Sequence, residues 1–318
     1  MMRILLLCIC LVGQSIIGTS QSSSSAKPAF LNLLKEYPNV RDFSNSEDTK
    51  EAYFSAQSPL GEVSAIMMIK KIDERWNSPE IASFSGKFQD LEPFLSPDGL
   101  SLYFASNRPL SDTSDKTKDY DIWRVERKNK NSPWSNPINL GSPVNTEHNE
   151  FYPSLSANKN LYFTSDLPDS KAKDDIFFSS WNNDSYSKPV SLSDSINSDG
   201  YEFNAYIAPD ESFLIFSGYN REDGLGSGDL YISYKKKDQS WSKAKNLGSD
   251  INSQYMDYCP YVNTKTNILY FTSKRSNLEI PNEGFNSAND FLKIVTSYEN
   301  GLSRIYLASF ENFLLLKK

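Results

Sequence analysis

The sequence predicts an all-β protein, a β-propeller of four-stranded antiparallel blades. One apolar motif recurs five times at near-constant spacing, and glycines and prolines separate short apolar runs. Aromatic residues also make up 13% of the 318 residues. A period of this length is typical of solenoids, propellers and arrays. Four short strands per repeat favour the propeller, in which stacked blades bury faces that one small sheet would expose.

The recurring motif is a short aliphatic and aromatic strand, present in five copies. The copies are Ala52-Tyr53-Phe54-Ser55, Leu102-Tyr103-Phe104-Ala105-Ser106, Leu161-Tyr162-Phe163-Thr164-Ser165, Leu214-Ile215-Phe216-Ser217 and Leu269-Tyr270-Phe271-Thr272-Ser273. Their second residues are 50, 59, 53 and 55 positions apart along the numbering. We therefore predict five blades, and a degenerate sixth blade after Ser276 is the alternative.

The second copy shows a complete repeat. An inner strand over 92–96 is followed by the turn Pro97-Asp98-Gly99, where Asp-Gly supplies the positive φ of a tight hairpin. The second strand covers 102–106, the third 121–125 and the fourth 137–141. An aromatic residue stands before the fourth strand at Trp134, Tyr186 and Trp241, and earlier at Trp76. We interpret these aromatics as packing between blades rather than as a ligand platform.

The two ends of the repeat region are irregular. The inner strand of the first unit is not evident, and strands are expected over Phe291–Val295 and Arg304–Ala308 in the last. Ring closure is expected either from an N-terminal strand that joins the last blade or from residues 313–316.

The first residues have the pattern of a secretory signal peptide. Arg3 precedes an apolar run, and Gly18-Thr19-Ser20 supplies the small residues of a cleavage site. The expected organisation is a signal peptide over 1–20, a Ser-rich linker with a short helix over 21–41, and a propeller over 42–318. The protein is then secreted or periplasmic, and an uncleaved N-terminal anchor is the alternative. Cleavage leaves Cys259 as the remaining cysteine, which we expect to be buried.

The repeat resembles a known family. The string Glu92-Pro93-Phe94-Leu95-Ser96-Pro97-Asp98-Gly99-Leu100-Ser101-Leu102-Tyr103-Phe104-Ala105-Ser106-Asn107-Arg108, followed by Tyr120-Asp121-Ile122-Trp123, resembles the WD-like repeat of TolB-type β-propellers. The resemblance implies an exported or periplasmic propeller. It does not imply the role of TolB itself, because the chain leaves no room for the separate N-terminal domain of TolB, and the same repeat occurs in peptidase propellers.

Composition and motifs exclude several functions. The net charge of −7 argues against a general nucleic-acid binder. No further apolar run is long enough to span a bilayer, so the mature chain is not expected to be an integral membrane protein. The single histidine, His148, lies in a loop of the sequence, which argues against catalysis by a Ser–His or Cys–His pair. We expect no cofactor and no metal site.

An acidic residue recurs just before the inner strand in four repeats. The acids are Asp90, Glu150, Glu202 and Asp257, and an asparagine precedes three of them by five residues. Strand alternation places them on the same face as the long loops Asn107–Lys118, Asp166–Lys173, Tyr219–Gly228 and Lys274–Asn289, together with Arg108, Arg221 and Arg275. These seven charged residues are the candidate ligand-binding site. The alternative is that the acids fix blade to blade while the arginines neutralise them.

Two classes of function fit this sequence. The first is an exported, non-enzymatic module that binds a protein or glycan partner through the acid-bearing face. The second is a carboxylate-based glycan hydrolase or lyase on a five-bladed propeller. The enzyme requires two or three acids on the inner strands that face the axis and differ from their repeat equivalents. Because the sequence shows one histidine and no acidic motif outside the repeat, it favours the binding module.

Overall fold

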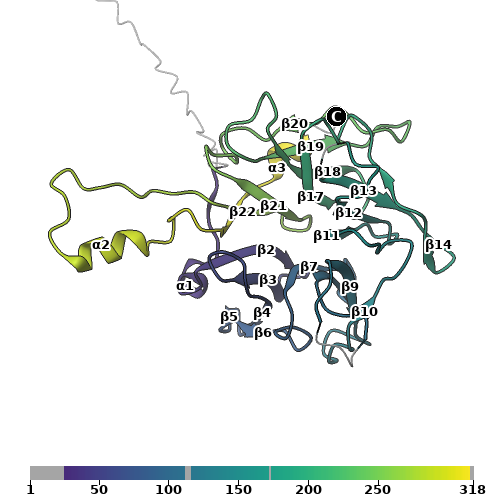
Figure 1. Ribbon diagram of the computed structural model, residues 1–318, viewed down its shortest axis with the longest axis horizontal. Helices are drawn as coiled ribbons and strands as arrows, with labels where there is room; N and C mark the ends of the chain where they lie inside the picture. The colour runs from purple at the N-terminus through teal and green to yellow at the C-terminus, as the bar shows by residue number, and fades with distance from the viewer. Residues whose placement is uncertain (1–24, 112–115, 172, 316–318) are drawn as a thin grey trace, which may run out of the picture.

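The computed structural model describes residues 25–111, 116–171 and 173–315, so the predicted signal peptide lies outside the described residues. The fold is a five-bladed β-propeller whose blades are four-stranded antiparallel sheets around a central axis (Figure 1). The five-blade prediction is confirmed. No helix in the described part of the chain is long and apolar enough to cross a membrane.

Each blade runs from an inner strand at the axis to an outer strand at the rim. Blade 1 contains β2 (Asn39–Asn45), β3 (Glu51–Gln57), β4 (Ser64–Ile72) and β6 (Glu80–Ile81), with β5 (Arg75–Trp76) extending β4 as a hairpin. Blade 2 contains β7 (Asp90–Leu95), β8 (Ser101–Ser106), β9 (Asp121–Glu126) and β10 (Ile138–Asn139). Blade 3 contains β11 (Glu150–Leu155), β12 (Leu161–Ser165), β13 (Asp175–Ser179) and β16 (Val190–Ser191), with the small hairpin β14 (Trp181–Asn182) and β15 (Ser185–Tyr186). Blade 4 contains β17 (Tyr201–Ile207), β18 (Phe213–Tyr219), β19 (Asp229–Tyr234) and β20 (Lys245–Asn246).

Blade 5 closes the ring with the N-terminal end of the chain. Its strands are β21 (Asp257–Asn263), β22 (Ile268–Ser273), β23 (Arg304–Ser309) and, at the rim, β1 (Lys27–Pro28). The expectation of an N-terminal strand in the last blade is confirmed, whereas the C-terminal segment forms the short helix α3 (Glu311–Leu315). The propeller thus includes residues before position 42, and the expected short helix is α1 (Leu31–Leu34).

The strand expected at Phe291–Val295 is wrong, because these residues belong to the helix α2 (Ala288–Val295). Ser287 caps this helix, its hydroxyl accepting a hydrogen bond from the backbone N–H of Asp290. The third strand of blade 5 is β23, so α2 has no sheet edge to join. Apolar residues at positions 291, 294 and 295 fit a helix as well as a short strand, and the Ser-x-x-Asp cap was the missed signal.

Aromatic residues pack neighbouring blades together as predicted. Trp134 of blade 2 donates its Nε1–H to the Tyr53 hydroxyl of blade 1 at 3.1 Å. Trp241 of blade 4 lies edge-on to Tyr162 of blade 3, with ring centroids 6.4 Å apart. Each therefore contacts the recurring tyrosine on the second strand of the preceding blade, which explains why both positions repeat together.

Every inner strand contains a β-bulge at its third or fourth residue, where the register with the second strand shifts. The five residues at this position adopt positive φ although none is glycine. They are Asp42 (φ 60), Glu92 (φ 59), Tyr152 (φ 49), Asn204 (φ 51) and Cys259 (φ 52). Bulges redirect a side chain, and left-handed non-glycine residues store strain that the surrounding structure must offset.

Candidate functional site

The four predicted acids occupy one row at the end of the propeller where the inner strands begin. Register places Asp90 opposite Ser106, which in turn pairs with Asp121 on the third strand. The second strands end in this row and the third strands begin in it. The loops that connect second to third strands therefore lie at the same end of the propeller as the acids. We call this end the upper face and these five connections the upper loops: residues 58–63, 107–120, 166–174, 220–228 and 274–303.

All four acids are fully buried and hydrogen-bonded within the protein. Asp90 accepts hydrogen bonds from the hydroxyls of Ser85 and Ser106, both at 2.7 Å. Glu202 accepts from the backbone N–H of Ser198 at 2.7 Å and from its hydroxyl at 2.6 Å. Glu150 with Thr146, and Asp257 with Ser253, repeat this arrangement. Each acid therefore closes the loop that leads into its own inner strand.

The three predicted arginines contact the same acids and the same incoming loops, and we call this set of contacts the joint between consecutive blades. Arg108 pairs with Asp90 at 2.6 Å, Arg221 with Glu202 at 2.8 Å and Arg275 with Asp257 at 3.3 Å. Each guanidinium also donates to a carbonyl of the incoming loop, at Phe84, Ile196 and Ile251 respectively. The guanidinium groups lie over aromatic rings of the second and third strands, for example Arg221 over Phe216 and Tyr231.

The preceding asparagines attach the loop to the blade before it. Asn145 accepts a hydrogen bond from the Ile122 N–H and donates to the Ile122 carbonyl, both at 2.9 Å. Asn197 does the same at Ile176, and Asn252 at Leu230. Acid, arginine and asparagine together join consecutive blades. Their burial and their protein partners support the interpretation as blade fixation over contact with a ligand.

Glu150 differs from the other three acids because no arginine among the described residues pairs with it. Leu167 stands two residues after Ser165, the position that Arg108 holds after Ser106 and Arg275 after Ser273. Burial raises the pKa of Glu150 from 4.5 to about 7, although its hydrogen bonds from Thr146 act in the opposite direction. Blade 3 therefore carries a carboxyl group that titrates near neutral pH.

A second polar cluster lies at the axis and was missed by the sequence analysis. Arg41 donates from Nε to Asp42 at 2.7 Å and from Nη2 to Glu92 at 2.9 Å. Glu92 also accepts from the Tyr152 backbone N–H at 2.7 Å, and the Cys259 thiol donates to Asn204 at 3.4 Å. The five strained bulge residues thus meet in one network that includes all five blades. The sequence did contain a signal for this cluster. The residue two positions after each of the four acids differs in every repeat, whereas the acid itself recurs.

Burial is the main cause of the raised pKa values in this axial cluster. Burial raises the pKa of Glu92 to about 7, with Arg41 opposing the shift and Asp42 adding to it. Burial also raises the pKa of the Cys259 thiol well above its ordinary value, so this cysteine is buried as predicted and held as a thiol.

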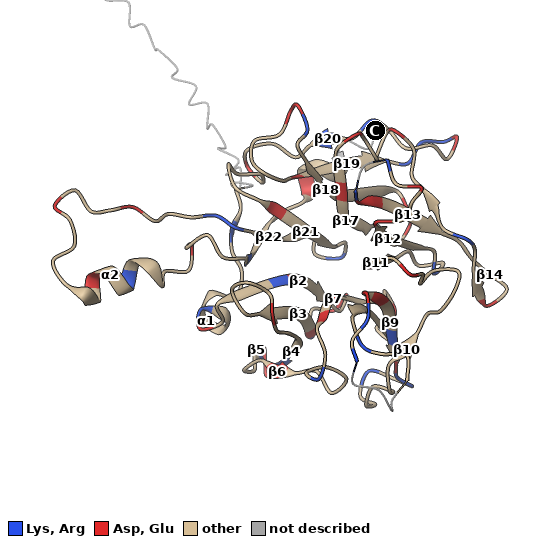
Figure 2. Ribbon diagram, in the orientation of Figure 1, with Lys and Arg blue, Asp and Glu red and all other residues tan. Residues whose placement is uncertain are grey.

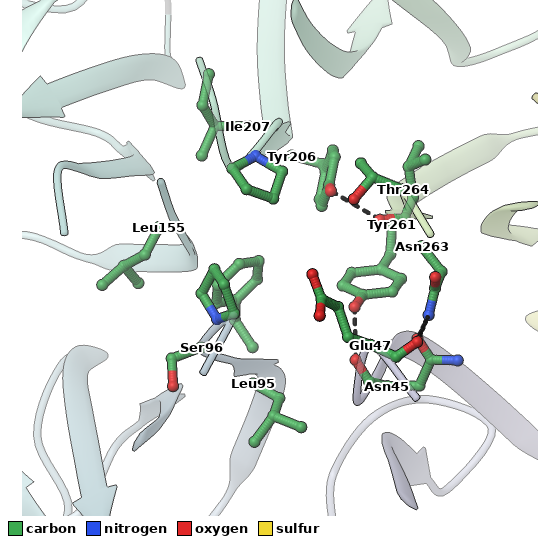
Figure 3. Close-up of a pocket in the computed structure, with 14 residues that line it drawn as sticks. Asn45, Glu47, Leu95, Ser96, Leu155, Tyr206, Ile207, Tyr261, Asn263 and Thr264 are labelled. Atoms are coloured by element: carbon green, nitrogen blue, oxygen red, sulfur yellow. Dashed lines mark hydrogen bonds between the residues drawn. The ribbon is translucent and has the colours of Figure 1, made fainter. Parts of the chain in front are cut away.

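The opposite end of the axis is filled by aromatic rings (Figure 3). The Tyr261 hydroxyl donates to the Asn45 carbonyl at 2.6 Å, and the Tyr206 hydroxyl donates to the Val262 carbonyl at 2.7 Å. The two rings are edge-to-face with centroids 5.3 Å apart. The cavity among them is about 30 Å³, space for about two water molecules rather than for an organic ligand.

Exposed apolar side chains gather on the upper loops. Leu110 is 68% exposed and Ile280 76% exposed. Further exposed apolar residues on these loops are Leu60, Val63, Leu225, Leu278, Phe285, Phe291 and Leu292. In the described part of the chain, none of the exposed large apolar residues lies in the five turns between first and second strands.

The upper loop of blade 5 projects away from the body as an arm that contains α2 (Figure 1). A bridge between Ser276 and Asn300 closes its base. No residue of α2 is buried, and Phe285 packs edge-on to Phe291 with centroids 5.3 Å apart. The arm also carries Glu279, Glu283, Asp290 and Lys293 (Figure 2). It is therefore an amphipathic element whose apolar side chains face solvent.

The single histidine, His148, lies in the loop before β11. His148 is partly exposed, and its Nδ1 lies 4.0 Å from Asp166. Among the described residues, no group of three or more His, Cys, Asp or Glu side chains is arranged to hold a metal ion.

No protein-family model matches this sequence, and no curated protein matches it. Similar solved structures include TolB from Acinetobacter baumannii, 13% identical over 85% of this chain and 54% of that chain, with a TM-score of 0.47. A thermostable family-43 glycoside hydrolase is 9% identical over 74% of this chain and 84% of that chain, with a TM-score of 0.50. Another glycoside hydrolase is 8% identical over 86% and 87% of the two chains, with a TM-score of 0.53.

This chain therefore spans about half the length of the Acinetobacter TolB. At these identities the similarity to the two glycoside hydrolases supports the propeller fold alone, and function has to be argued from this chain's own residues.

Proposed function

We propose that this protein is exported and acts as a non-enzymatic binding module whose working surface is the set of upper loops. The observation that carries the proposal is the gathering of exposed apolar side chains on these loops and on the α2 arm. Large exposed apolar patches mark interaction sites, and loops on a rigid scaffold commonly carry binding residues. The partner is a protein, because apolar side chains on a projecting helix fit a complementary groove.

The sequence analysis placed the binding surface at the four acids, whereas this proposal places it on the upper loops. Asp90, Glu150, Glu202 and Asp257 have protein donors and no exposed surface, so in this proposal they support the loops without touching the partner. The arginines have the same role.

Site-specific photocrosslinking tests the proposal. A benzoylphenylalanine placed at Phe291 or at Leu110 should yield a crosslinked partner from the cell envelope or the medium. The same probe at Lys128, an exposed residue of a turn on the opposite face, is the matched control. Crosslinks from Lys128 alone would reject the upper loops as the working surface.

Export has its own test. N-terminal sequencing of protein recovered outside the cytoplasm should find a mature chain that begins near Gln21. An intact N-terminus in a soluble cytoplasmic fraction would contradict export while leaving the binding surface open to the crosslinking test.

A glycan hydrolase or lyase is the second candidate, and the axial carboxylates favour it. Asp42 and Glu92 lie on inner strands, differ from their repeat equivalents and are held by one arginine. Against it, both are buried, and Glu92 accepts hydrogen bonds from three blades. Reducing-end release from a polysaccharide panel, lost in Glu92→Gln, would establish the enzyme and reject the binding module.

A further inference from the structure

The joint of blade 3 differs from the joints of blades 2, 4 and 5 in its charge. Among the residues that the structure describes, no arginine pairs with the acid of blade 3, whereas each of the other three blades has such a pair. Leu167 has the place in the chain that Arg108 has in blade 2, and its side chain packs against the apolar core. Glu150 is nevertheless fully buried, like the paired acids. Blade 3 therefore buries a carboxyl group that no guanidinium balances.

A buried hydroxyl beside Glu150 marks the place of the missing group. In blade 2, Ser106 accepts a hydrogen bond from Arg108 Nε at 2.9 Å and donates to Asp90 at 2.7 Å. Ser165 has the same register position in blade 3, directly opposite Glu150. It is fully buried, and its hydroxyl has no hydrogen-bond partner. Glu150 thus lies beside an unsatisfied hydroxyl where Asp90 lies beside a hydroxyl and a guanidinium.

The charged groups around Glu150 do not take the place of the arginine. Asp121 and Asp119 of blade 2 both act against its ionisation. The lysines of the neighbouring upper loops already face acids of their own: Lys118 faces Asp119 and Asp121, Lys171 faces Asp194, and Lys173 faces Asp174. The other titratable groups of the surrounding loops and strands are Glu147, His148, Asp166 and Asp175. Carboxyl groups therefore dominate the surroundings of Glu150.

Thr146 is the residue that holds Glu150. Its N–H donates to the carboxyl group at 3.1 Å and its hydroxyl at 2.6 Å. A hydroxyl can accept as well as donate, so it can keep its bond to a protonated carboxyl group, whereas a guanidinium requires a carboxylate. The Thr146 hydroxyl also accepts from the His148 N–H at 3.0 Å. The start of the segment 146–149 is thus attached to blade 3 through this carboxyl group.

We propose that this joint opens in a pH-dependent way: residues 146–149 stay attached to blade 3 while Glu150 is protonated and are released when it ionises. Ionisation puts a charge into a fully buried site that has no cation, and opening lets water solvate that charge. In blades 2, 4 and 5 an arginine balances the carboxylate, so these joints have no comparable reason to open. The inference goes beyond the proposed function, since the joint responds to pH whether or not the upper loops bind a partner.

The direction of the response follows from the protonation of Glu150. Burial raises the pKa of this group from 4.5 to about 7 in the closed joint. Between these two values the closed joint holds a proton that the open, solvated joint has lost. Closure is therefore strongest at acidic pH, weakens as the pH rises to about 7, and changes little at higher pH.

Amide hydrogen exchange of the mature protein at pH 5 and pH 8 tests this inference. After correction for the intrinsic exchange rate at each pH, the Thr146 N–H should lose between about tenfold and about seventyfold in protection, the upper value applying if opening exposes the carboxyl group fully. Ser198 is the matched control in the same molecule, because it donates to Glu202 through its N–H and its hydroxyl and Glu202 is paired with Arg221. Protection of the Ser198 N–H should change by less than about threefold.

Two results from the natural protein would overturn the inference. A loss of less than about threefold at Thr146 would mean that the joint does not respond to pH. An equal loss at Thr146 and Ser198 would mean that the whole ring responds rather than the joint of blade 3. Neither result depends on a binding partner, so the proposed function stands or falls separately in the crosslinking test.

Variants assign the response to Glu150. Glu150→Gln keeps the shape of the side chain and has no proton to lose, so protection of the Thr146 N–H should vary with pH by less than about threefold. His148→Gln should retain the response of the natural protein, because the His148 ring lies 4.0 Å from Asp166 and contributes only its backbone N–H to the joint. A full response in Glu150→Gln, or its loss in His148→Gln, would assign the pH dependence to another group and overturn the inference.

Discussion

Arg221 holds Glu202 through two hydrogen bonds, from Nε at 3.0 Å and from Nη2 at 2.8 Å, at the junction between blades 3 and 4. The same guanidinium donates to the Ile196 carbonyl of the connecting loop. The pair is buried on the carboxylate side and stacked on aromatic rings on the other. The acids recur in four blades and the arginines in three, and we interpret these pairs as contacts that hold an inner strand against the loop that precedes it.

We expect Glu202→Gln to destabilise the propeller by about 3 kcal/mol, because it leaves a largely buried guanidinium without its counter-charge. Urea denaturation measures the change in the free energy of unfolding. Glu222→Gln is the control, because Glu222 is an exposed acid directly after Arg221 in the same loop. This variant should change the free energy of unfolding little. If both variants behave alike, or if Glu202→Gln weakens partner binding without loss of stability, the joint interpretation is wrong.

Glu150 should make stability fall as pH rises from about 5 to 8. Its pKa is about 7 in the folded protein against an ordinary 4.5. Between those values the folded state holds a proton that the unfolded state has lost, so deprotonation favours unfolding, by at most about 3 kcal/mol at high pH. Melting temperatures across this range should therefore decline less steeply in Glu150→Gln than in the natural protein.

The pH control is Glu147→Gln, an exposed neighbour that should retain the slope of the natural protein. Glu92, with a pKa also near 7, should leave a residual slope in Glu150→Gln. A slope unchanged by Glu150→Gln would show that this carboxyl is ionised in the folded state.

Removal of the arm should leave the propeller intact. Replacing residues 279–296 with a short Gly-Ser linker keeps the Ser276–Asn300 bridge and the Tyr298 contacts with blade 5. Because no residue of α2 is buried, we expect the free energy of unfolding to change by less than about 1 kcal/mol. Loss of partner crosslinking from Leu110 should accompany the deletion if the arm contributes to binding. A large loss of stability would instead place the arm in the fold.

The recurrence of the second-strand motif was enough to predict the blades. The motif recurs because the propeller buries the same strand in every blade. The Tyr53 and Trp134 positions recur for the same reason, because the contact between them is repeated between Tyr162 and Trp241. The helix α2 was mistaken for a strand because nothing in that loop repeats, and a short apolar run fits both periods.

The axial cluster could not be predicted from the repeat for the opposite reason. Asp42, Glu92 and Cys259 occupy one structural position, yet they share no chemistry, and only the bulge brings them together. The acids Asp90 and Glu202 were found as a pattern, but their burial followed from hydroxyl and arginine partners that lie 16 and 19 residues away. Sequence located the charged residues, and only the structure showed that they are buried against protein partners.

Phe30 packs between blades 1 and 5, the two blades that close the ring. We call the contact between these two blades the seam, and removal of the Phe30 ring should open it. The ring lies 5.2 Å from Phe43 and 5.6 Å from Trp76 of blade 1, and 6.2 Å from Tyr270 of blade 5, measured between centroids. Phe30→Ala should therefore destabilise the protein by about 3 kcal/mol. Leu31→Ala, at an exposed neighbour, is the control.

Cys259 reports whether the seam opens. Its thiol is fully buried at the axis, with a pKa raised by burial, so a thiol reagent should react with it only when the ring opens. In mature protein, where the predicted leader and its two cysteines are absent, Phe30→Ala should accelerate labelling by dithionitrobenzoate at least about tenfold over the natural protein. Leu31→Ala should label at the natural rate. Equal rates in all three proteins, with the loss of stability present, would contradict the prediction, because labelling of Cys259 would then depend neither on opening of the seam between blades 1 and 5 nor on global unfolding.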